Sequence, residues 1–171
     1  MNTTQETKQI SILFTTYTDF ISRLVALFSG FDCTHVSISL DNEDEYFYTF
    51  NTKGFRKEYP KKHKKRTKEN VCLRFQVTDA QYKKIKNRLN KFERKQHKYS
   101  YDYLGVFLCM FRLQRKAKWK YFCSSFIAEL LEKANVVTLE KRNTRYLPNH
   151  LKRELLLCPL LIGVAQNIFI A

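Results

Sequence analysis

The sequence predicts a single α+β domain over residues 1–171, and three observations carry this prediction. Residues 34–40 alternate polar and apolar side chains, and residues 46–51 return as an aromatic strand after an acidic turn, which predicts a hairpin. The segment Thr78-Asp79-Ala80-Gln81 has the pattern of a helix capping box, and apolar residues at helical spacing follow it. A length of 171 residues with 44% hydrophobic content fits one full core and is too short for two.

The other elements follow in order along the chain. Residues 9–17 are rich in β-branched and aromatic side chains and predict a first strand. Thr18 or Asp19 can cap a helix that Gly30 ends. The apolar residues of one face of this helix are Phe20, Leu24, Leu27 and Phe28. The elements expected beyond the hairpin are an exposed, poorly ordered loop over 53–70, a strand over 71–77, helices over 82–92, 101–110, 122–134 and 149–157, and a closing strand over 160–170.

The charge is strongly basic, with 31 Lys and Arg against 16 Asp and Glu and a formal net charge of +15. Residues 53–68 contain a single acid, Glu58, and residues 83–98 again contain one, Glu93. A basic face of this kind attracts nucleic acid, anionic lipid or another polyanion. A solvated, lysine-rich surface without a partner is the other explanation of the same pattern.

The cysteines argue against a metal centre. There are five of them, at positions 33, 72, 109, 123 and 158, with no CxxC pair. Structural zinc and iron–sulfur sites use closely spaced ligands, so we expect no metal and no cofactor. An odd number of thiols among apolar neighbours also indicates a reducing compartment. No signal-peptide pattern and no run of about 20 apolar residues is present, so we expect the chain in the cytoplasm.

Cys123 is the strongest candidate for chemistry, because it opens an amphipathic helix in the run Tyr121-Phe122-Cys123-Ser124-Ser125. A helix N-terminus offers free backbone N–H groups and the positive end of the dipole, which favour a thiolate and a developing oxyanion. His35, at the head of the alternating strand, could serve as its base. Cysteine is also among the most buried residue types, so packing alone is the alternative role of Cys123.

The remaining thiols and histidines are weaker candidates. Cys33 lies two residues from His35 but lacks a helix N-terminus, so it ranks behind Cys123 as a nucleophile. His63, His97 and His150 lie in basic loops or at helix ends, where we expect solvated side chains.

Two blocks of sequence carry a family resemblance. The first is Cys33-Thr34-His35-Val36-Ser37-Ile38-Ser39-Leu40-Asp41, and the second is Phe122-Cys123-Ser124-Ser125-Phe126-Ile127-Ala128-Glu129-Leu130-Leu131. Together with Tyr46-Phe47-Tyr48-Thr49-Phe50 and Tyr101-x-Tyr103-Leu104-Gly105, the chain resembles the permuted NlpC-type papain-like cysteine hydrolases, especially YiiX-like proteins. It is more distantly similar to the lecithin:retinol acyltransferase group. The similarity runs from about Ile10 to the C-terminal helix.

The resemblance implies a circularly permuted papain-like fold, in which an antiparallel sheet packs against helices including the one that starts at the cysteine. It implies that Cys123 is the nucleophile and His35 the base, in the reverse of the usual papain-like order. A polar residue on the following strand orients the imidazole in that family, and counting across the hairpin places Thr49 there. Relatives often carry Glu or His at that place, and a threonine hydroxyl is a weaker orienter.

The implied activity is a thiol hydrolase or acyltransferase that acts on an amide or ester bond through a thioester. The substrate would be a small molecule, a peptide or a lipid acyl group, with Tyr101 and Tyr103 lining the cleft and an anionic lipid or polyanion at the basic loop 53–68. The competing interpretation is a non-catalytic basic module that binds nucleic acid or anionic membrane, because Tyr and Phe alternate with Lys and Arg over 95–121. No sequence-specific nucleic-acid motif is present.

Overall fold

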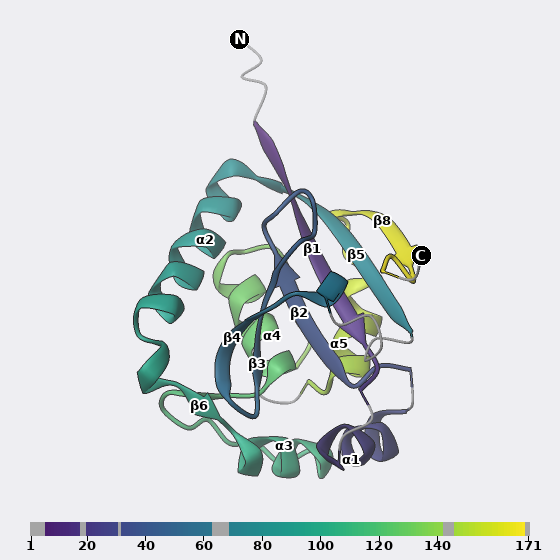
Figure 1. Ribbon diagram of the computed structural model, residues 1–171, viewed down its shortest axis with the longest axis vertical. Helices are drawn as coiled ribbons and strands as arrows, with labels where there is room; N and C mark the ends of the chain where they lie inside the picture. The colour runs from purple at the N-terminus through teal and green to yellow at the C-terminus, as the bar shows by residue number, and fades with distance from the viewer. Residues whose placement is uncertain (1–5, 18–19, 31, 63–68, 142–145, 170–171) are drawn as a thin grey trace.

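The computed structural model describes residues 6–17, 20–30, 32–62, 69–141 and 146–169 and has mixed α+β architecture, as the sequence predicts (Figure 1). An antiparallel six-stranded sheet has the order β4-β3-β2-β1-β5-β8. Its strands are β1 (Thr7–Thr15), β2 (His35–Ser39), β3 (Phe47–Asn51), β4 (Gly54–Glu58), β5 (Asn70–Thr78) and β8 (Leu161–Gln166). The helices are α1 (Phe20–Ser29), α2 (Asp79–Arg94), α3 (Tyr103–Met110), α4 (Cys123–Lys133) and α5 (Pro148–Leu155). A 3₁₀ helix, η2 (Gln96–Lys98), and a parallel pair, β6 (Ser100–Tyr101) and β7 (Lys120–Tyr121), connect α2 to α4.

The main core lies between one face of the sheet and helices α2, α4 and α5. It joins strand residues such as Ile12, Ile38 and Phe50 to helix residues such as Ile85 and Phe126, all of them fully buried. Figure 1 places α4 and α5 behind the sheet and α2 along its flank. Because α4 packs directly on β2 and β3, the position of its first turn is fixed by the middle of the sheet.

Two local predictions are confirmed. Strands β2 and β3 form the expected antiparallel hairpin, with Ile38 opposite Tyr48. Helix α2 begins with a complete capping box: the Thr78 hydroxyl accepts the Gln81 backbone N–H at 3.2 Å, and the Gln81 side-chain oxygen accepts the Thr78 N–H at 2.9 Å. These bonds satisfy two of the N–H groups that a helix start leaves unpaired.

The prediction of a loop throughout 53–70 is wrong for its first part, because Gly54–Glu58 forms strand β4 on the edge of the sheet. The Asn51 side-chain oxygen accepts the Lys53 backbone N–H at 2.9 Å, and Gly54 has a φ of 88°, a conformation that favours glycine. This turn chemistry makes a tight hairpin out of a stretch whose composition resembles a loop. Residues 63–68 lie outside the described residues.

The apolar stripe of helix α1 is not in the core. The helix ends at Gly30 as predicted, where φ is 95° and the Gly30 N–H bonds to the Ala26 carbonyl. However, Phe20 is 76% exposed and Leu27 is 69% exposed. The residues that α1 buries are Ser22, Val25, Ala26 and Ser29. A stripe of this kind usually packs on the core, so its exposure here needs its own explanation.

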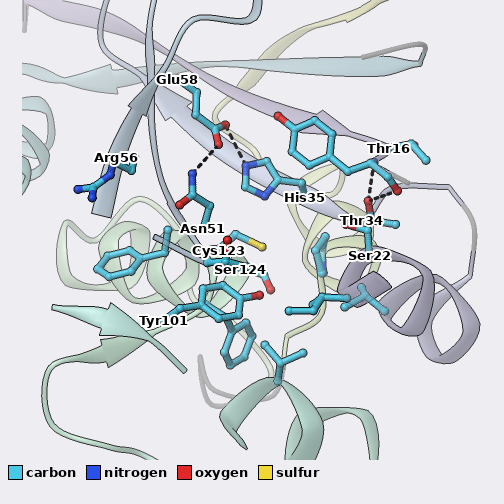
Figure 2. Close-up of a pocket in the computed structure, with 18 of the residues that line it drawn as sticks. Thr16, Ser22, Thr34, His35, Asn51, Arg56, Glu58, Tyr101, Cys123 and Ser124 are labelled. Carbon is cyan, nitrogen blue, oxygen red and sulfur yellow. Dashed lines mark hydrogen bonds and ion pairs between the residues drawn. The ribbon is translucent and has the colours of Figure 1, made fainter. Parts of the chain in front are cut away.

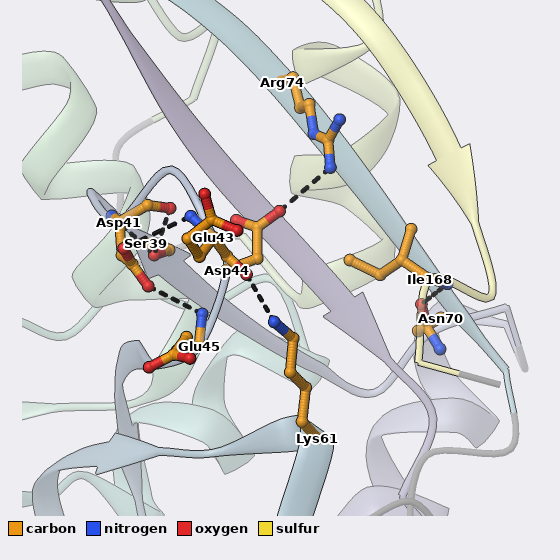
Figure 3. A network of polar contacts seen from close by, with 9 residues as sticks. All are labelled: Ser39, Asp41, Glu43, Asp44, Glu45, Lys61, Asn70, Arg74 and Ile168. Atoms are coloured by element: carbon orange, nitrogen blue, oxygen red, sulfur yellow. Dashed lines mark hydrogen bonds and ion pairs between the residues drawn. The ribbon is translucent and has the colours of Figure 1, made fainter. Parts of the chain in front are cut away.

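The acidic turn between β2 and β3 is held by its own hydrogen bonds (Figure 3). The Asp41 carboxylate accepts the backbone N–H groups of Glu43 at 3.4 Å and Glu45 at 2.9 Å. Buried Asp44 forms an ion pair with Arg74 of β5 at 3.1 Å. Lys61 donates to the Glu43 carbonyl at 2.7 Å, so the segment that follows β4 is tied to this turn.

Candidate active site

Cys123 is the first residue of helix α4, and local hydrogen bonds define where that helix starts. The residue before it, Phe122, has extended backbone angles (φ −112°, ψ 165°). The Phe122 backbone N–H donates to the Ser125 hydroxyl at 3.0 Å, and the Ser124 hydroxyl donates to the Tyr146 carbonyl at 2.6 Å. The two serines therefore anchor the helix start, and the backbone N–H groups of the first turn have no partner within the helix.

His35 begins strand β2 and is held on two sides. Its Nε2 atom lies 3.0 Å from the Glu58 carboxylate, which reaches it from β4. The ring of Tyr17 packs beside the imidazole, with 4.8 Å between centroids and 33° between planes. Figure 2 shows the second ring nitrogen of His35 facing the sulfur of Cys123. The structure therefore brings together the cysteine and the histidine that the sequence predicted as a pair.

The electrostatics of the site favour a protonated imidazole. Burial alone would lower the pKa of His35, but the Glu58 carboxylate and the side-chain hydrogen bonds to Cys123 and Glu58 outweigh it. The pKa of His35 is therefore raised well above its ordinary value. A ring with this preference takes a proton readily from a neighbouring thiol and holds it beside the carboxylate.

Glu58 is the residue that sequence analysis missed. It was counted as the single acid of a basic loop, whereas it is the last residue of β4 and contacts the imidazole. The Asn51 side-chain amide donates to its other carboxylate oxygen at 3.4 Å, so both oxygens have partners in the site. The signal that could have found it is the turn at Asn51 and Gly54, which predicts a third strand and places an acid at its end.

The Thr49 hydroxyl, which the resemblance implied would orient His35, bonds to the sheet backbone in the structure, so its orienting role stays a prediction. This hydroxyl is fully buried and donates to the Val36 carbonyl at 2.8 Å, so its proton is used in a bond between β3 and β2. The pairing of Ile38 with Tyr48 and the bond from Thr49 to Val36 place Thr49 beside the middle of β2. The imidazole of His35 instead contacts Glu58.

The site lies in an open cleft of about 1190 Å³ with two unlike walls. The sheet wall carries His35, Glu58, Asn51 and the basic side chains Lys53, Arg56 and Lys57. The helix wall is mainly apolar and is formed by Ile21 and Val25 of α1, Val106 of α3, and Leu147 and Pro148 at the start of α5. Cys123 lies at the N-terminus of α4 between the two walls and is only 5% exposed.

The two tyrosines assigned to substrate binding have different positions. Tyr101 lines the cleft beside Cys123, as expected (Figure 2). Tyr103 is exposed and does not line it; its hydroxyl donates to the Thr52 carbonyl at 3.5 Å, and its ring packs edge-on against Tyr101 at 4.9 Å. Tyr103 therefore supports Tyr101 and the β3–β4 turn from outside the cleft.

Two other buried thiols, Cys33 and Cys72, are weaker candidates than Cys123. Burial raises the pKa of Cys33 to about 12 and that of Cys72 to about 11. Both side chains are at most 2% exposed, so Cys33 is not the rival nucleophile that its position near His35 suggested. Desolvation favours the neutral thiol at both positions, whereas Cys123 has a cleft and a histidine beside it.

The first three basic residues of the segment line the cleft, whereas Lys61 and Lys62 do not. Lys53, Arg56 and Lys57 line the sheet wall, and Lys57 also pairs with Glu93 at 2.8 Å. Glu58 and Glu69 line the same cleft, so its charged lining is mixed. The basic residues at 64, 65, 66 and 68 lie outside the described residues, so the expected binding of the segment to a polyanion stays a prediction.

The fold and the site together define an α+β protein with a helix-start cysteine, a strand histidine and a carboxylate at one cleft. No protein-family profile matches the sequence, and no curated protein matches it either. Among the described residues, no helix combines the length and apolar character needed to cross a membrane.

Proposed function

We propose that this chain is a thiol hydrolase or acyltransferase of the permuted papain-like type that acts on an amide or ester bond. The observation that carries the proposal is the position of His35, whose ring lies between Glu58 and Cys123 at the bottom of a cleft. Cysteine nucleophiles need an adjacent base and a third group that orients the base. In this proposal Glu58 is the orienting group and Thr49 has no catalytic role.

The acylation step uses the groups in this order. His35 takes the thiol proton of Cys123, and the sulfur attacks the acyl carbon of the substrate. Backbone N–H groups at the start of α4, beginning with that of Cys123, stabilise the oxyanion. The bond to the leaving oxygen or nitrogen then breaks, and the His35 imidazolium returns its proton to that atom. Cys123 is left as a thioester.

The second step regenerates the thiol. His35 removes a proton from water or from an acceptor hydroxyl or amine, the resulting nucleophile attacks the thioester, and the proton passes to the departing sulfur. Glu58 stabilises the imidazolium that forms in both steps. The apolar helix wall suits the acyl side of a substrate, and the basic sheet wall suits a polar or anionic remainder. These features fit a small molecule, a peptide or a lipid acyl group.

The test is acyl transfer from p-nitrophenyl acetate and p-nitrophenyl octanoate, followed by intact-mass measurement and peptide mapping. We expect release of p-nitrophenol together with a hydroxylamine-labile acyl adduct on Cys123. His35→Ala should slow acylation by about 10²–10⁴-fold, the usual contribution of a positioned base. Cys123→Ala should abolish the adduct.

Cys33→Ala is the matched control, because Cys33 is a buried thiol near the same strand with a pKa raised to about 12. We expect it to acylate like the wild type. If the adduct is spread over several cysteines, or if Cys123→Ala releases p-nitrophenol as fast as the wild type, the proposed function is wrong. The chain would then be the alternative, a non-catalytic basic binding module.

A further inference from the structure

Helices α1 and α3 carry an exposed apolar surface, here called the α1–α3 ridge. Its members are Leu27 and Phe28 of α1, Leu104 and Phe107 of α3, and Phe111 and Leu113 just after α3. Four of them have large exposed fractions, namely Leu27 (69%), Phe107 (54%), Phe111 (52%) and Leu113 (55%). Figure 1 shows α1 and α3 side by side at the lower end of the molecule, and the two helices are in contact.

The three phenylalanines of the ridge form one contiguous cluster. The rings of Phe28 and Phe111 lie 5.4 Å apart, which joins α1 to the end of α3, and those of Phe107 and Phe111 lie 5.1 Å apart. Leu104, Phe107 and Phe111 recur at the spacing of one helix face. Contiguous exposed apolar patches are rare on soluble proteins and mark places where another apolar surface docks.

The basic residues near the ridge indicate which kind of partner binds there. Helix α1 has one charged residue, Arg23, and the stretch from Tyr103 to Lys120 has no acid and five basic residues, at 112, 115, 116, 118 and 120. Arg23 and Arg112 are exposed. Burial, followed by the positive charges of Lys141, Arg153 and Arg112, lowers the pKa of His150, so His150 of α5 lies near Arg112. An apolar stripe rimmed by basic side chains has the composition of an interfacial helix on an anionic bilayer.

We propose that the α1–α3 ridge is a docking surface for an anionic lipid membrane, with its apolar side chains among the acyl chains and its basic rim against the headgroups. A second copy of this chain is a poor occupant, because each chain carries a net charge of +15 and identical basic rims would face each other. Other residues of the same two helices, Ile21, Val25 and Val106, line the cleft. Docking on the ridge therefore holds the helix wall of the cleft next to the membrane.

The test is co-sedimentation of the full chain with vesicles of phosphatidylcholine alone or mixed with phosphatidylserine. We expect binding to the mixed vesicles that weakens with added salt. A ridge variant, Leu27→Gln with Phe107→Gln and Phe111→Gln, should bind at least about tenfold more weakly, since the lost side chains are those that bury apolar area. Arg23→Gln with Arg112→Gln should weaken binding and flatten its salt dependence.

The matched control is Leu157→Gln with Ile162→Gln and Val164→Gln. It replaces three similarly exposed apolar side chains, two on the edge strand β8 and one between α5 and β8, and should bind vesicles like the wild type. Circular dichroism checks that both triple variants fold. Equal binding by the ridge variant and the wild type would overturn the proposal. Two other results would also overturn it. One is that the wild type forms a dimer and the ridge variant is a monomer. The other is that the ridge variant loses binding to single-stranded DNA while it still binds vesicles like the wild type. Cys123→Ala should dock normally, so the result is separate from the chemistry proposed above.

Discussion

The sheet side and the helix side of the cleft both contain clustered aromatic rings, but the rings have opposite surroundings. Behind the sheet wall, Phe50, Phe55 and Phe126 lie 5.1–5.8 Å from one another and are at most 2% exposed. On the outer side of the helix wall, Phe107 and Phe111 make a ring contact of 5.1 Å while more than half of each side chain is exposed. Ring geometry is thus the same in both clusters. The two clusters differ in whether another part of the protein packs over the rings.

The largest expected effect is a difference in stability between the two clusters. Phe126→Ala should lower the free energy of unfolding by about 3–5 kcal/mol, because it removes a fully buried ring and leaves a cavity among its neighbours. Phe107→Ala should change it by no more than about 0.5 kcal/mol, as at other surface positions. Urea denaturation with comparison of midpoints measures both. A loss from Phe107→Ala as large as that from Phe126→Ala would mean that the ridge is part of the folded core.

The same contrast explains which parts of the fold the sequence could predict. The stripe Phe20, Leu24, Leu27 and Phe28 identifies a helix and its apolar face correctly, but helical spacing says nothing about what the face will contact. Tyr82, Ile85, Leu89 and Phe92 show the same kind of pattern on α2, where the last three are buried against the sheet. Neighbouring layers decide between these outcomes, and they come from distant parts of the chain.

The candidate site was predictable for two of its three main groups. Cys123 follows from a local rule, since a helix start is visible in ten residues of sequence. The position of His35 is predictable because it begins a strand in which polar and apolar side chains alternate clearly. Glu58 depends on a short edge strand with a basic, loop-like composition; the turn at Asn51 and Gly54 marks that strand, but no local pattern shows that its last residue contacts His35. The place of Thr49 is hard to predict for the same reason, because the pairing of β2 with β3 depends on an acidic turn whose side chains bond to its own backbone.

A second prediction concerns the buried pair on the sheet wall. Glu58→Gln should lower the free energy of unfolding by about 1–3 kcal/mol near pH 6, because it removes the charged partner of a buried imidazole. The folded pKa of His35 is raised above the unfolded value, so this stability is fully present below about pH 6.5 and is lost as the pH rises through the folded pKa. The deficit of the variant should therefore be largest from about pH 5 to 6.5 and shrink at higher pH. Urea midpoints at a series of pH values measure it.

Glu93→Gln is the matched control for that experiment. Glu93 pairs with Lys57 at 2.8 Å, but both side chains are more than a third exposed, so the loss should be at most about 1 kcal/mol with no such pH dependence. A deficit in Glu58→Gln that grows with pH would contradict the assignment of a charged His35 in the folded protein.

The smallest expected effect concerns Thr49, and it tests whether Thr49 or Glu58 orients the imidazole of His35. Thr49→Val should lower the free energy of unfolding by about 1 kcal/mol, because it deletes one buried hydrogen bond to the Val36 carbonyl. It should leave the rate of Cys123 alkylation by iodoacetamide unchanged, since the Thr49 hydroxyl donates into the sheet and Glu58 holds the imidazole. His35→Ala, measured in parallel by peptide mapping, should slow that alkylation. A slower reaction in Thr49→Val with the fold intact would restore Thr49 as a positioning residue, because a purely structural hydroxyl has no route to the thiol.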